Sequence, residues 1–483
     1  MSRLYEKIEY YAQHAPDHKA FTYRVSEQYE SIDYVMLRDY VDSLSAQLSD
    51  HAGQTIAILG NNKLEYAVSL LAVLGRVGDA LLIDKELGKE DILRIFETCR
   101  PDLILLDDAI NLSFEGFSVL RFSEICEMMR GGQKSKVDPD FAGSLILHTS
   151  GTTGEPKCVR LSEAQYYGVI PELNQKWGVL PQHSCLFIIP LYHVYALTSL
   201  FHGLYAGIEN ILEWDYKRID RVLKKTHPCL FMGVPLMYNR IKDAIFEKAG
   251  AKIKVAVALS NLLLKLGIDL RKKLFGEIYS YFGGQYVFGV SAGSLLPYPT
   301  SKFFHDVGLP IYNVYGMTET SGPVAINYQG HDRYDSVGEI LNLNEVVIRN
   351  ADENGVGQVC VRGSNVFDGY LGEKESANFD GEYFYTGDLG YVKDGFLYVI
   401  GREKGILVGA NGKNVSPEEL NRKILECNRI HDCNVILEKD RLVAIVNTEL
   451  SEEEVRNHLD KVNQSLPKYK RIADFRITQK NVK

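Results

Sequence analysis

The sequence predicts an α/β protein with doubly wound sheets, and three observations support that prediction. Short apolar runs alternate with amphipathic helical segments as far as Val290, which is typical of parallel sheets covered by helices. After Asp335, short β segments separated by glycine turns predict a small β-barrel-like subdomain. A last unit of helices and strands begins near Gly401. We therefore expect two doubly wound sheet subdomains and the barrel-like subdomain in residues 1–401, and a small α+β domain in residues 402–483.

The first sheet is predicted from short apolar runs between helical segments. These runs indicate strands at Thr55–Leu59, Ala80–Ile83, Leu103–Leu106 and Gly143–Leu147, with helices at Leu64–Val77 and Glu90–Cys99. Residues 4–48 are expected to be helical at both ends, around a strand pair at Ala20–Tyr23 and Tyr29–Ile32.

The same alternation predicts the rest of the chain. The second sheet takes strands at Cys185–Ile189, Cys229–Met232 and Tyr286–Val290, with a helix at Ala196–Tyr205. The barrel-like part takes strands at Glu345–Ile348, Gln358–Arg362, Tyr391–Val392 and Phe396–Val399. The last unit takes helices at Pro417–Cys427 and Glu452–Leu466 and strands at Asn434–Leu437 and Leu442–Val446.

Composition excludes several classes of protein. The chain has 483 residues, of which 45% are hydrophobic and 24% are charged, and this is ordinary for a globular protein and unlike a disordered one. Lysine and arginine number 54 against 63 aspartates and glutamates, which gives a net charge of −9. An acidic chain is a poor general binder of nucleic acid, because that affinity depends on neutralising phosphates. Any phosphate must therefore be held locally.

The cysteines and the apolar runs bear on the compartment. Eight cysteines are scattered without a CxxC pair, so neither a zinc ribbon nor a disulfide framework is indicated. The N-terminal residues lack the apolar run of a signal peptide, and the most apolar stretch, Val255–Leu266, is shorter than the roughly 18 residues of a membrane span. We expect a cytoplasmic protein without integral membrane association.

A loop rich in hydroxyls and glycine follows the strand predicted at Gly143–Leu147. It reads TSGTTGEPK, and its candidate phosphate ligands are Thr149, Ser150, Gly151, Thr152, Thr153, Gly154 and Lys157. Glycine and small hydroxyl residues let backbone N–H and side-chain O–H groups converge on an anion, and lysine adds a point charge. The spacing differs from that of a Walker loop, and Pro156 blocks a helix at this point. The alternative is a polar surface turn.

The string HTSGTTGEPKCV resembles the signature loop of the adenylate-forming superfamily, which comprises acyl- and aryl-CoA synthetases, peptide-synthetase adenylation domains and luciferases. Further motifs of that family follow in order: PLYH at 190–193, SAGSLLP at 291–297, YGMTE at 315–319, YTGDLG at 385–390, GREK at 401–404 and NGKNVSPEE at 411–419. The similarity spans roughly residues 4–475 and is greatest to the fatty acyl-CoA synthetase branch. It implies a cytoplasmic ligase that uses ATP, Mg²⁺ and CoA.

The resemblance implies a role for each phosphate-side residue. The loop Thr149–Lys157 would hold the β- and γ-phosphates of ATP, and Thr318 would contact the α-phosphate. Glu319 would hold Mg²⁺, which prefers carboxylate oxygen. His193 would gate the carboxylate pocket. The alternatives are an N-terminal helix acid at Glu319 and a polar turn at the loop.

The nucleoside side is implied by the same resemblance. Asp388 would accept hydrogen bonds from both ribose hydroxyls, and Tyr315 would stack on adenine. The segment beside the adenine contributes Ala292, Gly293 and Ser294, and Gly316 follows the stacking tyrosine. Taken alone, Asp388 could be a turn residue and Tyr315 a core tyrosine.

The last domain resembles the mobile domain of the family. Arg402 would reach the ribose, and Lys404 occupies the hinge position, about which the family rotates this domain between adenylation and thiol transfer. Gly412 would then meet the pantetheine. The alternative for Lys404 is a solvated surface lysine.

Four positions depart from the family pattern. Cys158 and Glu163 lie behind the phosphate loop, where glycine and histidine are usual, and Ala196 replaces a glycine and could narrow the pocket. The fourth concerns the lysine that bridges the carboxylate and the α-phosphate in the family's PxTxxGK segment. Here the chain reads IADFRITQKNVK. We therefore expect the domain to be truncated. We expect Lys480 or Lys483 to substitute, or adenylation to be slow.

Three hypotheses about function follow. The first is an ATP-dependent acid:thiol ligase that forms an acyl-AMP and then a thioester, with CoA or the phosphopantetheine of an acyl carrier protein as the thiol. The second is a nucleotide-binding pseudo-enzyme that has lost adenylation activity. The third is a luciferase-like oxygenase, for which the sequence offers no specific feature. The carboxylic acid is expected to be fatty or aryl.

Overall fold

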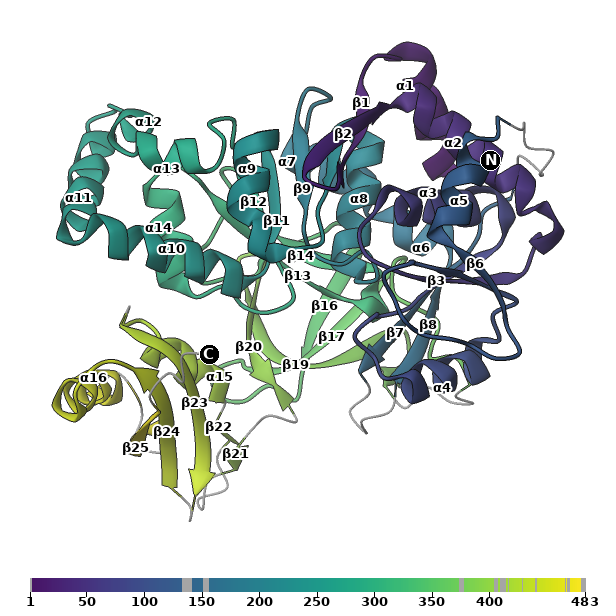
Figure 1. Cartoon of the computed structure of the whole chain (residues 1–483). Coiled ribbons are helices and arrows are strands. Elements are labelled where there is room, and N and C mark those ends of the chain that lie inside the picture. Colours follow the sequence, from purple (N-terminus) through teal and green to yellow (C-terminus); the bar gives the residue numbers. More distant parts are fainter. Residues whose placement is uncertain are drawn as a thin grey trace.

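The computed structural model describes residues 2–132, 141–150, 156–372, 378–403, 407–408, 414–415, 417–427, 429–438, 441–464, 466 and 470–478. Figure 1 shows a large body formed by the chain up to about β20 and a smaller unit, coloured yellow, that contains α15, α16 and β21–β25. Among the described residues, no helix is long and apolar enough to cross a membrane. All eight cysteines are free thiols.

The first sheet of the described chain has six strands in the order β6-β5-β3-β4-β7-β8, parallel except for the last. The inner strands are almost wholly apolar because both faces of the sheet are covered. The strands are β3 Thr55–Leu59, β4 Asp79–Leu82, β5 Leu103–Leu106, β6 Ser118–Arg121, β7 Leu145–Ser150 and β8 Pro156–Leu161.

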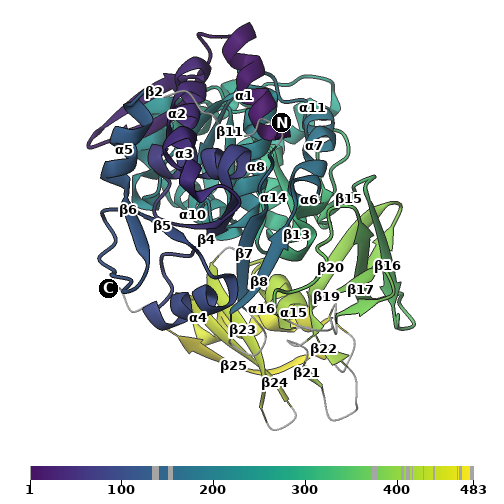
Figure 2. The ribbon, with the colours of Figure 1, turned by 90° about the vertical axis from the view of Figure 1, so that its right-hand side faces the viewer.

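The second sheet joins a parallel part to an antiparallel part through β13. Within the described residues it has 14 strands, in the order β16-β17-β19-β20-β15-β14-β13-β12-β11-β9-β10-β1-β2, with β18 beside β19. The strands from β1 to β13 along this path are parallel, and β2 and those beyond β13 are antiparallel. Figure 2 shows β16, β17, β19 and β20 at one edge of the large body.

The bounds of these strands follow. The parallel part and its hairpin comprise β1 Lys19–Val25, β2 Gln28–Asp33, β9 Ser184–Phe187, β10 Glu209–Leu212, β11 Leu230–Gly233, β12 Phe288–Ser291 and β13 Ile311–Met317. The antiparallel part comprises β14 Gly322–Ile326, β15 Gly338–Ile340, β16 Asn344–Arg349, β17 Gly357–Gly363, β18 Phe379–Asp380, β19 Tyr383–Lys393 and β20 Phe396–Arg402.

Helices pack on these sheets through apolar faces. Asp33 caps α2 by accepting a hydrogen bond from the Met36 backbone N–H. The helices are α1 Arg3–His14, α2 Tyr34–Gln47, α3 Leu64–Ala72, α4 Lys89–Cys99, α5 Phe122–Arg130, α6 Glu163–Gly168, α7 Ile170–Trp177, α8 Val194–Ala206, α9 Ile219–Thr226, α10 Pro235–Ala249, α11 Ala251–Lys265, α12 Arg271–Leu274, α13 Gly276–Tyr281 and α14 Tyr298–Asp306.

The smaller unit has a core of its own. It contains β21 Leu407–Val408, β22 Asn414–Val415, α15 Pro417–Ile424, β23 Ile430–Glu438, β24 Arg441–Thr448, α16 Glu452–Gln464 and β25 Ile472–Thr478. Leu420, Ile424, Val435, Ala444 and Val455 are buried together in one cluster. β23, β24 and β25 form a sheet in that order.

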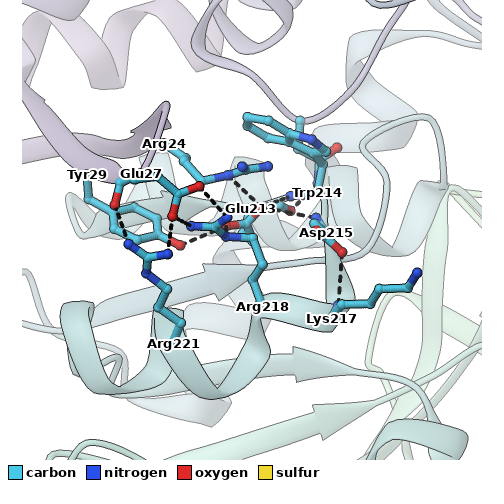
Figure 3. Close-up of polar contacts among 10 residues, drawn as sticks. Arg24, Glu27, Tyr29, Glu213, Trp214, Asp215, Lys217, Arg218 and Arg221 are labelled. Atoms are coloured by element: carbon cyan, nitrogen blue, oxygen red, sulfur yellow. Dashed lines mark hydrogen bonds and ion pairs between the residues drawn. The ribbon is translucent and has the colours of Figure 1, made fainter.

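A buried carboxylate fastens the β1–β2 hairpin to the parallel sheet (Figure 3). Glu213 follows β10 and is fully buried. Arg24 lies 3.2 Å from it, and the Tyr29 hydroxyl donates to it at 2.7 Å. The backbone N–H groups of Trp214 and Asp215 also donate to this carboxylate, at 2.9 and 3.0 Å. These partners offset the cost of burying the charge.

The α/β architecture expected from the sequence is confirmed, with differences of detail. Thr55–Leu59 and Leu103–Leu106 have the predicted bounds, whereas the helix expected at Leu64–Val77 ends at Ala72 and continues as a π-helical turn, Val73–Val77. The strand expected at Gly143–Leu147 spans Leu145–Ser150 instead. β25 was not foreseen, and the barrel-like strands continue the second sheet through β14.

Candidate active site

The ends of neighbouring parallel strands bring two sequence motifs together. β12 and β13 are parallel, with Ser291 opposite Asn313. The SAGSLLP segment leaves the carboxyl end of β12, and the YGMTE segment begins at the carboxyl end of β13. In open α/β sheets, ligands bind outside the carboxyl ends of the strands. This edge is therefore the candidate active site.

Lys157, Tyr370 and Glu319 form the first cluster. The Lys157 Nζ lies 4.7 Å from the centre of the Tyr370 ring, and the Tyr370 hydroxyl donates to the Glu319 Oε1 at 2.7 Å. Glu319 lies in a short 3₁₀ turn, Thr318–Thr320, and is 6% exposed. The lysine at the end of the predicted phosphate loop thus lies one side chain away from the predicted magnesium ligand, although 162 positions separate them in the chain.

Asp388, Tyr315 and Arg402 form the second cluster. The Tyr315 hydroxyl donates to the Asp388 Oδ2 at 2.6 Å, and the Arg402 Nε lies 2.7 Å from the Asp388 Oδ1. Asp388 is opposite Arg402 in the β19–β20 pair and is 5% exposed, whereas the Arg402 side chain is 58% exposed. Burial and the neighbouring carboxylate hold the pKa of Tyr315 well above its usual range. Tyr315 is therefore a neutral hydrogen-bond donor.

The SAGSLLP segment forms an open turn. Ala292 is buried, whereas Gly293 and Ser294 are exposed, and Gly293 has a φ of +85° that favours glycine. Gly316 serves the fold, because a Cβ there would lie 2.0 Å from the Gly322 carbonyl oxygen. Thr318 is half-buried in the turn that carries Glu319.

A histidine pair forms the third cluster. His193 is the residue before α8, and its ring lies 4.6 Å from that of Tyr192. Desolvation lowers the pKa of His193 and of His148, and nearby Asp84 opposes both shifts. The His148 Nε2 accepts a hydrogen bond from the Asp84 backbone N–H at 3.0 Å. His148 therefore carries its proton on Nδ1, and the lowered pKa values favour two neutral rings at neutral pH.

The donor set around Glu319 suits a hard divalent cation. Its carboxylate is buried and lies beside the half-buried Thr318, and both side chains offer oxygen atoms. Among the described residues, no group of three or more histidine, cysteine or acidic side chains forms a metal site by itself. A cation here would thus take further oxygen ligands from a bound phosphate or water.

A cavity of about 370 Å³ opens between the large body and the smaller unit. Leu296 of the SAGSLLP segment and the stacked Tyr391 and Tyr398 line one side. Arg422 and Lys423, in the last turn of α15, line the other. The seam between the two units is therefore only partly packed beside the candidate site.

Several predicted site residues lie outside the described parts of the chain: Gly151, Thr152, Thr153, Gly154, Lys404, Gly412, Lys480 and Lys483. Thr149 is described, in register with Lys157 across the β7–β8 hairpin, and the backbone of Ser150 lies opposite Pro156. Both described ends of the predicted loop thus belong to paired strands, and β8 was not among the expected strands.

The structure adds residues that sequence reasoning missed. Tyr370 links the two predicted phosphate-side residues, and Asp84 contacts His148. Neither stands in a motif singled out beforehand, and only the folded chain brings each beside its partners.

The structure locates three of the four departures from the family pattern. Glu163 accepts hydrogen bonds from the Ser2 hydroxyl and the Arg3 backbone N–H, at 2.6 and 2.9 Å, and so anchors the N-terminal helix. Cys158 is buried on β8 in an apolar cluster with α4 residues. Ala196 is buried within α8.

Comparison with known proteins places these features in a family context. Residues 8–371 match the model of a family described as AMP-binding enzyme. The chain is 27% identical over 86% of its length to a 2-succinylbenzoate–CoA ligase of Lactococcus lactis, of which the match covers 84%. It is 30% identical over 57% of its length to a long-chain-fatty-acid–CoA ligase of Mus musculus, of which the match covers 46%.

Solved structures share the fold. An anthranilate CoA ligase in complex with anthranoyl-AMP matches with a TM-score of 0.80 and 18% identity, over 99% of this chain and 94% of that one. The o-succinylbenzoate CoA synthetase of Bacillus subtilis in complex with ATP and a magnesium ion matches with a TM-score of 0.75 and 22% identity, over 98% of this chain and 95% of that one.

Proposed function

Because the chain belongs to the AMP-binding enzyme family, we propose that its site adenylates a carboxylic acid with ATP and then passes the acyl group to the thiol of CoA. It is an acyl-CoA synthetase-like ligase, as its relatives are. One observation carries the proposal: Tyr315, which contacts Asp388, and Glu319, which contacts Tyr370 beside Lys157, stand four positions apart on one segment. A nucleoside triphosphate fits that arrangement, with its ribose at one end and its phosphates at the other.

The first step needs alignment and charge stabilisation more than proton transfer. A carboxylate oxygen attacks the α-phosphorus of ATP, the bond to the β-phosphate breaks, and pyrophosphate leaves. Asp388 accepts hydrogen bonds from the ribose hydroxyls, with Arg402 and Tyr315 holding its orientation. Lys157 and the rest of the predicted phosphate loop hold the β- and γ-phosphates, and Thr318 contacts the α-phosphate.

Glu319 would hold Mg²⁺. Glu319 also orients Tyr370 by accepting the hydrogen bond of its hydroxyl. When bound, the cation offsets the negative charge of the phosphates. The buried carboxylate and the neighbouring Thr318 hydroxyl support this assignment, because both are hard oxygen ligands.

His193 faces the acid in this proposal. A neutral imidazole can donate one hydrogen bond to a carboxylate without pairing with it so strongly that attack is suppressed. Desolvation lowers the pKa values of both His193 and the adjacent His148, and these lowered values support this role. The acid itself is fatty or aryl, as the names of the relatives indicate.

The second step transfers the acyl group. The CoA thiol attacks the acyl carbonyl, its proton passes to solvent, the C–S bond forms, and AMP leaves with the bonding electron pair. We assign residues 1–401 to the adenylating domain and 402–483 to a domain that rotates about Lys404, which brings Gly412 to the pantetheine. The incompletely packed seam beside α15 supports that motion.

The test is a panel of acids with purified protein. One acid should support exchange of labelled pyrophosphate into ATP, and adding CoA should then release AMP and form a thioester. If a thioester forms with an acyl carrier protein but not with CoA, the acceptor is the carrier protein and not CoA. Binding of ATP without exchange on any fatty or aryl acid would contradict the proposal and favour a pseudo-enzyme.

A further inference from the structure

Helix α11 presents an apolar stripe to solvent. Val255, Leu259, Leu262 and Leu266 are 70%, 46%, 57% and 67% exposed. They are spaced by four, three and four residues, so they lie within an arc of about 60° on one helix face. Ile253 and Ser260 are buried on the opposite face. The helix is thus attached by one side and exposes its other apolar side.

The apolar surface continues past the end of the helix. Ile268, Leu270 and Leu274 are 45%, 40% and 37% exposed and follow directly in the chain. Figure 1 shows α11 and α12 at the outer edge of the large body, away from the candidate active site around β13. Contiguous exposed apolar side chains of this kind mark interaction surfaces, whereas single ones do not.

Basic side chains border this stripe. Residues 251–274 contain six lysines and arginines and one aspartate, whereas the whole chain has a net charge of −9. Lys252 flanks the stripe on one side, and Lys254 and Lys265 flank it on the other, by helical geometry. Lys272 and Lys273 follow in α12, and Asp269 is paired with Arg271 at 2.7 Å. The segment is strongly basic within an acidic protein.

We propose that α11 and the turn through Leu274 dock on the surface of a lipid bilayer that contains anionic lipids. The apolar stripe enters the boundary between headgroups and acyl chains, and the flanking lysines keep their charges at headgroup level on long apolar stems. Charge complementarity selects this occupant, because anionic headgroups match the basic border. A protein partner fits less well, since protein interfaces contain less lysine than the rest of the surface.

The consequence is a peripheral, reversible association that goes beyond the proposed reaction and does not depend on it. Two features combine, apolar insertion and electrostatic attraction, and each alone gives weak binding. The bilayer would also concentrate an apolar acid near the enzyme if the substrate is fatty.

The experiment measures co-sedimentation of the full chain with phosphatidylcholine vesicles, with and without about 30 mol% phosphatidylglycerol. Binding should require the anionic lipid and should fall about tenfold or more in high salt. Leu259→Ser/Leu262→Ser/Leu266→Ser and Lys252→Gln/Lys272→Gln/Lys273→Gln should each weaken binding about tenfold or more. Both variants should unfold at the wild-type temperature and keep acid-dependent pyrophosphate exchange with a water-soluble acid.

Matched controls carry the same kinds of change elsewhere on the surface. Leu180→Ser/Val392→Ser removes exposed apolar side chains, and Lys89→Gln/Lys393→Gln removes exposed charges; both should bind as the wild type does. An equal loss of vesicle binding in the control variants would overturn the proposal. Equal co-sedimentation with and without phosphatidylglycerol would also overturn it. So would a wild-type dimer that the triple serine variant dissociates without any vesicle binding, since the stripe would then be an interface between copies. Loss of ligase activity with vesicle binding intact would count against the proposed function and not against this surface.

Discussion

Asp388 is the residue proposed to bind the ribose hydroxyls of ATP. Its carboxylate is buried, yet it is held by Tyr315 and by the exposed Arg402. Asp388→Asn should raise the KM for ATP roughly tenfold or more, because hydrogen bonds to a charged acceptor contribute about 1.5–3 kcal/mol each. Initial rates at varied ATP concentration measure this, with thermal unfolding as the control for folding. A KM within twofold of wild type would refute the ribose assignment.

Tyr370 is the residue that the structure adds to the phosphate side. Its hydroxyl donates to Glu319 while its ring lies under Lys157. Tyr370→Phe keeps the ring and removes the hydroxyl donor. The adenylation rate should therefore fall roughly tenfold, which corresponds to the loss of about one hydrogen bond to a charged group. The Mg²⁺ concentration that gives half the maximal rate should rise. Tyr383→Phe, which removes a hydroxyl bonded to exposed Glu345, is the matched control. Identical Mg²⁺ dependence in the two variants would show that Tyr370 only packs.

His202 makes stability depend on pH. It is fully buried in α8, where desolvation lowers its pKa to about 4, and its Nε2 lies 3.2 Å from the Asn174 Oδ1. Below the ordinary histidine pKa of about 6.5, the unfolded chain takes up a proton that the folded chain refuses. The free energy of unfolding should therefore decrease as pH falls from about 6.5 towards 4, by up to about 3 kcal/mol from this residue.

Denaturant titrations across that pH range test the contribution of His202. His202→Gln should flatten the slope, although other histidines with lowered pKa values, such as His148 and His193, leave part of it. An unchanged slope in the variant would mean that His202 is protonated in the folded state.

At the scale of elements, one buried charge links the β1–β2 hairpin to the end of β10. Glu213 is fully buried, and it is contacted by Arg24 and Tyr29 from the hairpin (Figure 3). Glu213→Ala leaves the Arg24 guanidinium without this partner and should lower the free energy of unfolding by about 3–5 kcal/mol. Glu27→Ala, which removes an exposed carboxylate paired with Arg218, should change stability little. An equal decrease in the free energy of unfolding in both variants would contradict this distinction between a buried and an exposed carboxylate.

The elements also show why some were predictable. Thr55–Leu59 and Leu103–Leu106 are buried on both faces, so their apolar runs alone mark them as strands. β19 contains Gly387 and Gly390, which disfavour a strand locally, and pairing with β17 and β20 overrides that preference. β25 carries exposed charged residues at the edge of its sheet, so no apolar run marked it.

At the scale of the whole molecule, the motif order predicted which residues gather at the site but not how they contact one another. Tyr315 and Asp388 were both expected at the nucleoside, and they prove to be hydrogen-bonded across 73 positions. Tyr370 escaped prediction because its contact with Glu319 spans 51 positions and depends on the fold. The middle of the phosphate loop and the hinge stay predictions, since they lie outside the described residues.

Substitutions at the C-terminal end should affect the first half-reaction, formation of acyl-AMP, and not the second. We expect Lys480→Ala or Lys483→Ala to slow acyl-AMP formation about 10²-fold, because a cation between the carboxylate and the α-phosphate offsets their repulsion. Conversion of supplied acyl-AMP to thioester should stay near the wild-type rate in both variants. Stopped assays of each half-reaction measure this, and fast adenylation in both variants would mean that another cation fills the role.

The most direct test of the account is acid-dependent exchange of labelled pyrophosphate into ATP, measured for the wild type and for Lys157→Ala. We predict exchange with a fatty or aryl acid in the wild type and a loss of about 10²-fold in the variant, because the proposed role of Lys157 is to neutralise phosphate charge. The variant should still fold, since Lys157 lies at the end of the β7–β8 hairpin. Exchange that proceeds without any acid, or at the same rate in both proteins, would contradict adenylation of a carboxylic acid at this site.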